Sequence, residues 1–239
     1  MRMNSAFFWG GVLCAVLSAG PAPVSVSASL PPGGPVIEAA AAISAPLHFV
    51  ANAGQADARA LYYADAPGYT LWLTREGLVF DRVEKGGKGE PARAAVRLRF
   101  EGANTDCEVV AADPSDYRVS YFYGRDESEW TTDVPTTRAV LYKNLYDGID
   151  LKVYGRGREV EYDWIVAPGA DPEGIRFGYG DGQEAKLDEE GDLAIETAGG
   201  RILHRRPSAY QVIEGRKVEV GAAFGEKADG AYGFALSAY

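Results

Sequence analysis

Apolar and polar residues alternate along several short segments of the chain beyond Leu47. A period of two places successive side chains on opposite faces of a β-strand. These segments are also rich in β-branched and aromatic residues, which favour strands. They span residues 69–74, 95–101, 117–123, 138–142, 149–154 and 161–166. No segment of similar length has the 3.6-residue period of an amphipathic helix, so the pattern predicts strands joined by turns.

Turn signals separate the later strands at short intervals. Each consists of a residue followed by glycine, which supplies the positive φ that tight hairpins require. The pairs are Asp181-Gly182, Glu190-Gly191, Gly199-Gly200, Glu214-Gly215 and Asp229-Gly230. Short strands at about ten-residue spacing are typical of all-β sandwiches and barrels. We therefore predict an all-β fold, an antiparallel β-sandwich-like domain with many short hairpins.

The first residues of the chain have the order of a secretory signal peptide. Arg2 precedes an apolar run over residues 6–19, and Val26-Ser27-Ala28 resembles a cleavage site. The run is shorter than the roughly 20 residues that a membrane-spanning helix needs. We expect residues 1–28 to be removed, so that no membrane span remains, and the protein to be secreted or held at the cell surface, with the periplasm as an alternative.

A Pro/Ala-rich linker over residues 29–46 separates this leader from the folded part. Prolines favour extended backbone there, and the apolar stretch within it is too short to form a stable helix alone. The remaining residues, 47–239, are expected to form one all-β domain. Its length suffices for a core that needs no disulfide, and after cleavage Cys107 is the only cysteine left.

The stretch EYDWIVAPGADP, residues 161–172, combines a strand with an abrupt end. Tyr162, Trp164 and Val166 are expected on one face of the strand, and Glu161 and Asp163 on the other. Together with residues 149–156, the strand predicts a hairpin that turns at Arg156-Gly157. The pairs across a two-residue loop would be Lys152 with Glu161, Tyr154 with Glu159, and Asp150 with Asp163.

Two facing carboxylates repel each other unless a partner satisfies them. We expect Asp150 and Asp163 to be structural, with an arginine, backbone amides, a cation or water as the partner. The strand must end at Pro168 and Pro172, which cannot donate ladder hydrogen bonds. In the corner between them, Gly169 is expected to have a positive φ and Asp171 to accept backbone amides.

The motifs around this hairpin resemble the N-terminal domain of bacterial extracellular proteins with SBBP repeats, the seven-bladed β-propeller type. The matching features are Tyr146 to Asp150, Tyr154-Gly155, Glu161 to Trp164 and Val166 to Pro172. The resemblance extends to Phe49, Asn52, Gly54 and Gln55, to the loop around residues 121–135, and to Pro207, Tyr210 and Gln211. It covers residues 47–239.

The resemblance implies a domain of unknown function that precedes propeller or other surface modules in its relatives. It brings no catalytic residue and no cofactor with it. This chain stops at Tyr239, where such relatives continue into repeats, so it is either a solitary domain or a fragment. We expect a non-catalytic, exported β domain with a structural, docking or adhesive role. A carbohydrate-binding module and a carboxylate-pair glycoside hydrolase are the alternatives.

The residue inventory excludes several other chemistries. His48, His204 and Cys107 lack the spacing of a metal site, and no Gly-x-Ser-x-Gly motif accompanies the histidines. His204 is expected on the surface beside Arg205 and Arg206, and Cys107 is expected to be a small buried residue or an edge residue. A formal net charge of −10 disfavours nucleic acid as a partner.

Two oxygen-based sites stay open as alternatives. Calcium could bind the acidic turns near Asp147, Asp150, Asp163 and Asp171, although none fits an EF-hand loop. A glycosidase would need Asp150 paired with Asp163 or Glu161 at a separation of about 5 Å, which suits a retaining mechanism. We predict that neither is present: carboxylates in hairpins usually bind amides or arginine.

Aromatic residues are the remaining signal. The chain has 14 tyrosines and four tryptophans, and such rings bind sugars or anchor protein interfaces when they are exposed. We expect the rings of Trp72 and of residues 121–123 to fill the core of the sandwich. An exposed row of coplanar rings would instead favour a glycan ligand, and one apolar patch would favour a protein ligand.

Overall fold

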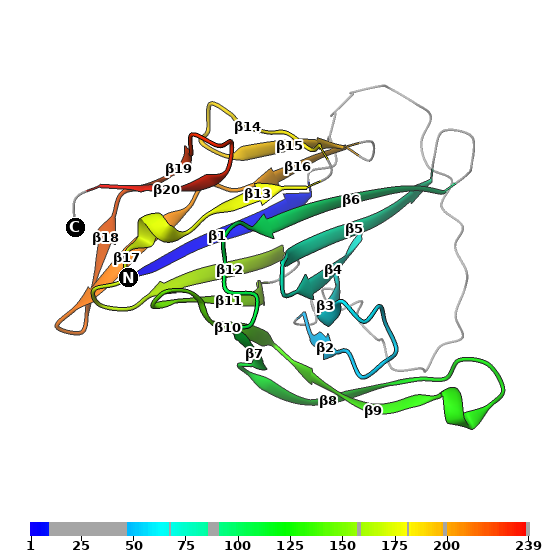
Figure 1. Ribbon diagram of the computed structural model, residues 1–239. Helices are drawn as coiled ribbons and strands as arrows, with labels where there is room; N and C mark the ends of the chain where they lie inside the picture. Colours follow the sequence, from blue (N-terminus) through cyan, green and yellow to red (C-terminus); the bar gives the residue numbers. More distant parts are fainter. Residues whose placement is uncertain are drawn as a thin grey trace, which may run out of the picture.

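The computed structural model describes residues 1–9, 47–66, 68–85, 91–156, 159–180, 182–197 and 200–237. Within these ranges the chain forms strands and two short 3₁₀ helices, η1 (Glu127–Glu129) and η2 (Pro172–Gly174) (Figure 1). All strand pairs in them are antiparallel. No helix there is long and apolar enough to span a membrane. The prediction of an all-β, antiparallel fold with short hairpins is therefore confirmed.

The strands form two sheets, which we call sheet A and sheet B. The order in sheet A is β14-β15-β16-β1-β12-β11-β10-β7, with β17 paired to β1 and β18 paired to β17. Its strands are β1 (Arg2–Trp9), β7 (Glu108–Ala111), β10 (Ala139–Tyr146), β11 (Ile149–Arg156), β12 (Glu159–Val166), β14 (Ala185–Leu187), β15 (Leu193–Thr197), β16 (Gly200–His204), β17 (Ser208–Ile213) and β18 (Arg216–Val220).

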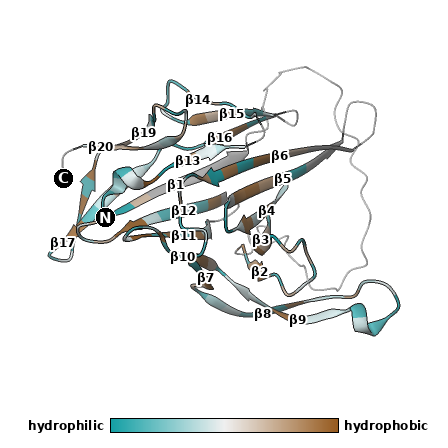
Figure 2. Cartoon of the chain, viewed as in Figure 1, coloured by the Kyte–Doolittle hydropathy of each residue, from teal (hydrophilic) through white to brown (hydrophobic). Residues whose placement is uncertain are grey.

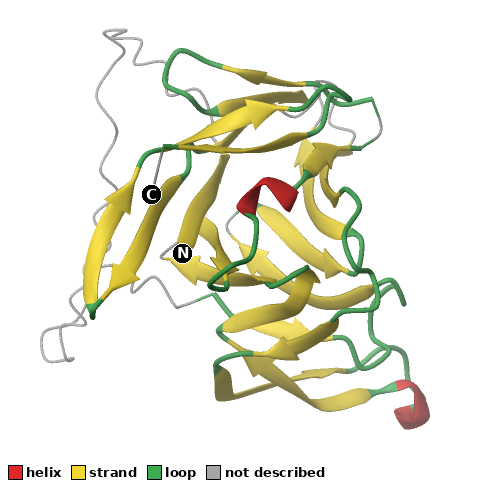
Figure 3. Ribbon diagram, turned by 60° about the vertical axis from the view of Figure 1, so that its left-hand side comes forward, coloured by secondary structure: helices red, strands yellow, loops and turns green. Residues whose placement is uncertain are grey.

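Sheet B has the order β19-β20-β13-β6-β5-β4-β3-β2-β9-β8. Its strands are β2 (Phe49–Ala51), β3 (Ala60–Ala66), β4 (Tyr69–Thr74), β5 (Gly77–Lys85), β6 (Pro91–Phe100), β8 (Pro114–Tyr121), β9 (Thr131–Thr137), β13 (Phe177–Tyr179), β19 (Ala222–Glu226) and β20 (Tyr232–Leu236). Figure 3 shows these strands as curved layers rather than flat sheets, as the natural twist of strands requires.

The main core lies between the two sheets and follows the predicted alternation. Tyr162 and Trp164 of sheet A are at most 2% exposed, as are Leu98 of β6 and Phe80 of β5. The rings of Phe100 and Trp164 meet edge to face across the sandwich at 6.1 Å, a favoured geometry for aromatic pairs. Figure 2 shows the resulting mixture of hydrophobic and hydrophilic residues along the strands. The core thus depends on residues from both sheets.

His204 lies in this core, and its expected surface position is wrong. The side chain is fully buried. Its Nδ1 is 2.8 Å from the hydroxyl of Tyr179, and its Nε2 contacts the hydroxyl of Tyr162. The ring of Phe224 packs against it at 4.6 Å. Because Tyr162 belongs to sheet A while Tyr179 and Phe224 belong to sheet B, His204 joins the two sheets.

Residues 2–9 form β1, a strand of sheet A, although the sequence predicts that the folded domain begins near Leu47. β1 lies between β12 on one side and β16 and β17 on the other, as the blue strand in Figure 1 shows. Met3 is fully buried in the main core. Removal of residues 1–28 stays a prediction, and the linker over residues 29–46 lies outside the described residues.

The buried histidine makes stability depend on pH. Burial lowers the pKa of His204 well below its usual value, so in mild acid the histidine is protonated in the unfolded chain but stays neutral in the folded protein. The contribution of His204 to the free energy of unfolding is therefore fully present above the unfolded pKa of about 6.5. Below that pH the free energy of unfolding falls by up to about 1.4 kcal/mol per pH unit.

We expect the free energy of unfolding to decrease between pH 7 and pH 5.5 in the parent protein. His204→Asn should remove this slope, whatever its effect on stability at pH 7, and His48→Asn should retain it. Urea unfolding at a series of pH values measures all three. An equal slope in the His204→Asn variant would show that this histidine is not the buried titrating group.

Candidate functional site

The hairpin of β11 and β12 carries most of the residues that the sequence singles out, but its register differs from the predicted one. Arg156 pairs with Glu159, and residues 157 and 158 lie outside the described residues. The predicted turn at Arg156-Gly157 is thus wrong by one residue, which shifts every pair by two positions. The observed pairs are Asp150 with Ile165, Lys152 with Asp163, and Tyr154 with Glu161.

This register separates the two aspartates that the sequence places opposite each other. Asp150 accepts a hydrogen bond from the backbone N–H of Asn144 at 2.7 Å, and Asn144 itself has φ +53°. Asp163 accepts a hydrogen bond from the Tyr154 hydroxyl at 3.0 Å. Burial, and then the charge of Asp163, raise the pKa of Tyr154. Each carboxylate has its own partner, and the facing pair that suggested hydrolysis is not assembled.

Glu161 is the most buried carboxylate of this hairpin. It is 7% exposed and forms an ion pair with the guanidinium of Arg156 at 3.3 Å. The side chain of Arg156 is itself 78% exposed, so solvent screens this ion pair in part. The arrangement is that of a structural ion pair on the outer side of the strand.

Trp164 faces the opposite way, into the main core. It is 1% exposed and packs against the rings of Phe100, Tyr146, Tyr162 and Phe234. Its indole N–H is buried without a hydrogen-bond partner within the described residues. A ring enclosed in this way cannot stack on a ligand.

The corner after β12 has the predicted backbone. Gly169 has φ +85°, in the left-handed region that side chains with a Cβ disfavour. Asp171 accepts a hydrogen bond from the N–H of Glu173 at 2.9 Å and so begins η2. Gly148 packs so closely beneath the corner that a Cβ there would lie 2.8 Å from the Cβ of Ala170. The corner is therefore a rigid, tightly packed turn.

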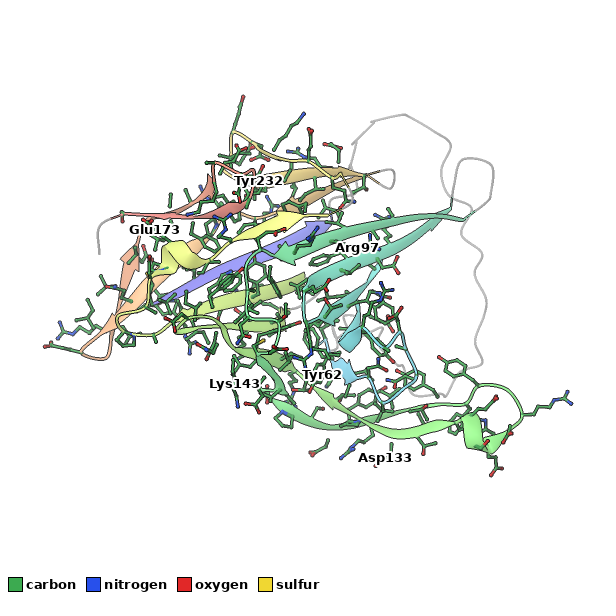
Figure 4. The ribbon with its side chains drawn as sticks, in the orientation of Figure 1. Tyr62, Arg97, Asp133, Lys143, Glu173 and Tyr232 are labelled. Atoms are coloured by element: carbon green, nitrogen blue, oxygen red, sulfur yellow. The ribbon has the colours of Figure 1, made fainter. Side chains whose placement is uncertain are left out.

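A cleft of about 550 Å³ opens between β13, β14, β19 and β20, within the usual size range of ligand sites. Its lining consists of Tyr179, Gln183, Glu184, Ala185, Lys186, Leu187, Phe224, Glu226, Gly230 and Tyr232. The hydroxyl of Tyr232 (labelled in Figure 4) donates to the carbonyl of Ala185 at 2.7 Å. Burial raises the pKa of Tyr232, and the charges of Glu226 and Glu184 add to the effect. The cleft thus offers rings and carboxylates, and it contains none of the residues of the β11–β12 hairpin.

A second exposed feature is the hairpin of β8 and β9 with its tip at η1, which we call the aromatic arm (residues 114–137). It extends from the body of the protein (Figure 1). Its exposed large side chains are Tyr117 at 58%, Phe122 at 63% and Tyr123 at 56%. The expectation that residues 121–123 fill the core is therefore wrong for Phe122 and Tyr123, whereas Tyr121 and Trp72 are half-buried and pack against a second, smaller hydrophobic cluster that contains Tyr63.

No group of three or more His, Cys, Asp or Glu side chains in the described part of the chain could hold a metal ion. Three of the aspartates expected near a calcium ion are instead engaged within the protein: Asp150 and Asp171 accept backbone amides, and Asp163 accepts a tyrosine hydroxyl. This arrangement provides no reason to assign a cation to the hairpin.

Comparison with known families gives one match. The profile of a family described as a domain of unknown function, DUF7948, matches residues 49–239. The chain belongs to this family. No curated protein and no solved structure matches the chain.

The match to DUF7948 begins at β2 and includes the aromatic arm, the cleft and the β11–β12 hairpin. It does not include β1. The arm is the feature of the DUF7948 domain that sequence reasoning missed, because a run such as Tyr121-Phe122-Tyr123 fits a buried strand equally well. The adjacent acidic turn, residues 124–129, was the available signal that the chain leaves the body at this point.

The glycines of the corner give a direct test of its geometry in the DUF7948 domain. Gly169→Ala should lower the free energy of unfolding by about 1–2 kcal/mol, the usual cost of left-handed backbone for a residue with a Cβ. Gly174→Ala is the matched control, because Gly174 lies in η2 and a Cβ there meets open space. Chemical denaturation measures both variants. Equal stabilities would contradict the described corner.

Proposed function

We propose that this DUF7948 domain is an exported, non-catalytic docking module that binds a neighbouring protein surface through the aromatic arm. The observation that carries the proposal is the exposure of Phe122 and Tyr123 on an extended hairpin. Monomeric proteins seldom present adjacent large aromatic side chains to water without a binding role. Aromatic residues are also the ones that contribute most to protein interfaces.

The rings of the arm are held in place before any partner arrives. Phe122 meets Trp130 edge to face at 5.1 Å, and Tyr123 stacks on Tyr121 at 6.1 Å with an angle of 19° between the rings. The hydroxyl of Tyr121 contacts that of Tyr63 in the body. A preformed set of rings loses little conformational entropy on binding, which favours affinity.

The backbone of the arm is also ordered at its tip. The carboxylate of Asp126 caps η1 by accepting the N–H of Ser128 at 3.0 Å. Within the arm, Arg118 forms an ion pair with Asp133 (labelled in Figure 4) at 3.7 Å. Among the described strands, β8 pairs only with β9 and so forms the edge of sheet B. Phe122 and Tyr123 follow directly after β8, in the segment that leads to η1.

The choice of partner rests on the sequence resemblance to the N-terminal domain of SBBP-repeat proteins. In such proteins the domain precedes propeller or other surface modules, and the arm lies in one of the resembling segments. We infer that the partner is a protein module of this kind outside the cytoplasm. Export through the signal-like residues 1–28 is part of the same proposal.

The cleft supports a second candidate function, the binding of a sugar. Its combination of Tyr179 and Tyr232 with Glu184 and Glu226 suits a ligand with apolar faces and hydroxyl donors. Calorimetric titration with soluble oligosaccharides tests this candidate. Binding that is lost in Glu226→Gln, and kept in an arm variant, would favour it over docking.

Photo-crosslinking tests the proposed docking role in the full chain. A photoreactive phenylalanine derivative replaces Phe122 in one variant and Val212 in the other, since Val212 is a similarly exposed apolar residue on the β17–β18 hairpin, at 64% against 63% for Phe122. We expect a discrete protein adduct from position 122 in the producing bacterium, abolished by Tyr123→Ser, and none from position 212. Equal labelling from both positions, or none from position 122, would overturn the arm as a docking site.

A further inference from the structure

Sheet A is continuous only because β1 occupies its centre. β1 pairs with β12 on one side and with β16 and β17 on the other. β17 has no described neighbour in the sheet apart from β1 and β18. Without β1 the sheet order separates into β12-β11-β10-β7, β14-β15-β16 and the β17–β18 hairpin.

The strand that joins these three groups lies outside the region that the family profile matches. The DUF7948 match covers residues 49–239, which include all three groups, whereas β1 comprises residues 2–9. β1 also lies within the segment whose sequence has the order of a cleaved leader. The matched region therefore contains the strands β12, β16 and β17 on both sides of β1, whereas β1 itself lies outside it.

The strands on both sides of β1 hold it mainly through backbone hydrogen bonds. At its N-terminal end, the ammonium group of Met1 donates to the carbonyl of Val166 at 2.9 Å, and the N–H of Val166 donates to the carbonyl of Met1 at 2.9 Å. From there the ladder continues along β12 to the pair Phe7 and Val160. Recognition by backbone ladders accepts many sequences, which is the basis of strand addition to sheet edges.

One side-chain position adds specificity. Met3 pairs with Trp164 on β12 and with Ala209 on β17, and its side chain is fully buried in the main core. Loss of the strand would expose the core side chains Tyr162 and Trp164 along the open edge. It would also leave two rows of backbone donors and acceptors unpaired, which is costly and prone to aggregation.

We propose that the space between β12 and β16–β17 is a strand-acceptor site, which binds an extended strand of a partner polypeptide once the leader has been removed. The donor strand runs antiparallel to β12 and places an apolar side chain where Met3 lies. Residues 2–9 hold the site closed until that exchange. This interface is distinct from the aromatic arm, and it rests on the removal of residues 1–28 that the proposed function includes.

A strand-exchange experiment on the full chain tests the proposal. A specific protease sequence is inserted between Ala28 and Ser29, and the chain is folded first and cut afterwards. The probe is the nonapeptide of residues 1–9 with a fluorescent label at its C-terminus, because the Met1 ammonium is part of the ladder. We expect the cut leader to co-elute with the body and to be replaced by the labelled peptide, with a saturable rise in anisotropy.

Three peptides serve as matched controls. Met3→Asp should weaken binding by at least about tenfold, because it buries a charge in the core. Ser5→Pro should weaken it as well, since proline removes a backbone donor from a strand that is paired on both sides. A peptide of the same composition in scrambled order tests non-specific adhesion. Equal binding of all four peptides would overturn the proposal.

The behaviour of the protein after cleavage distinguishes a partner strand from the other possible occupants of the acceptor site, which are the rest of the same chain and a second copy. Departure of the leader with an unchanged unfolding midpoint and no peptide binding would show that the rest of the chain closes the sheet, and the proposal would fail. Dimerisation of the body in place of peptide binding would overturn the assignment to a partner in favour of a second copy. Saturable exchange that requires the residue at position 3 supports the strand-acceptor site.

Discussion

The backbone ladder on both edges of β1 is the interaction on which the rest of the structure depends. It joins three groups of strands that share no other pairing in the described part of sheet A. Sheet A in turn provides half of the main core, including Tyr162 and Trp164. His204 then connects this half to sheet B through Tyr179 and Phe224. A gap at β1 would thus weaken the sandwich at its centre rather than at its rim.

Local pattern predicts most strands of this fold and the character of its turns. β4 has the predicted bounds, 69–74, and β12 places Tyr162, Trp164 and Val166 in the core as predicted. Glu214 and Gly215 both have positive φ, at +50° and +78°, as a tight hairpin between β17 and β18 requires. These features follow from a few neighbouring residues, which is why sequence alone suffices for them.

Features that depend on distant partners could not be predicted in the same way. Residues 2–9 have the sequence of a leader, and their pairing as a strand depends on β12 and β16, which lie far along the chain. The predicted register of the β11–β12 hairpin was wrong, because a one-residue change in the position of the turn moves each cross-strand pair by two positions. For His204 the charged neighbours suggested the surface, whereas its period-two spacing from Ile202, a buried residue, correctly indicates the core.

The candidate sites divide into parts that hold the fold and parts that face a partner. Asp150, Glu161, Asp163 and Asp171 are satisfied within the protein, so the sequence motif that contains them describes a rigid hairpin and corner. The aromatic arm and the acceptor site lie at different places on this frame. Both surfaces are proposals, and together they would give the domain a connecting role between larger parts of a protein.

Amide hydrogen exchange on the full, uncut chain tests the central role of β1 most directly. If β1 is an integral strand, the amides of residues 2–9 should exchange as slowly as those of β12 and β16, because they open only when the sheet opens. Exchange of residues 2–9 at the rate of an unfolded peptide, while β12 and β16 stay protected, would contradict the account.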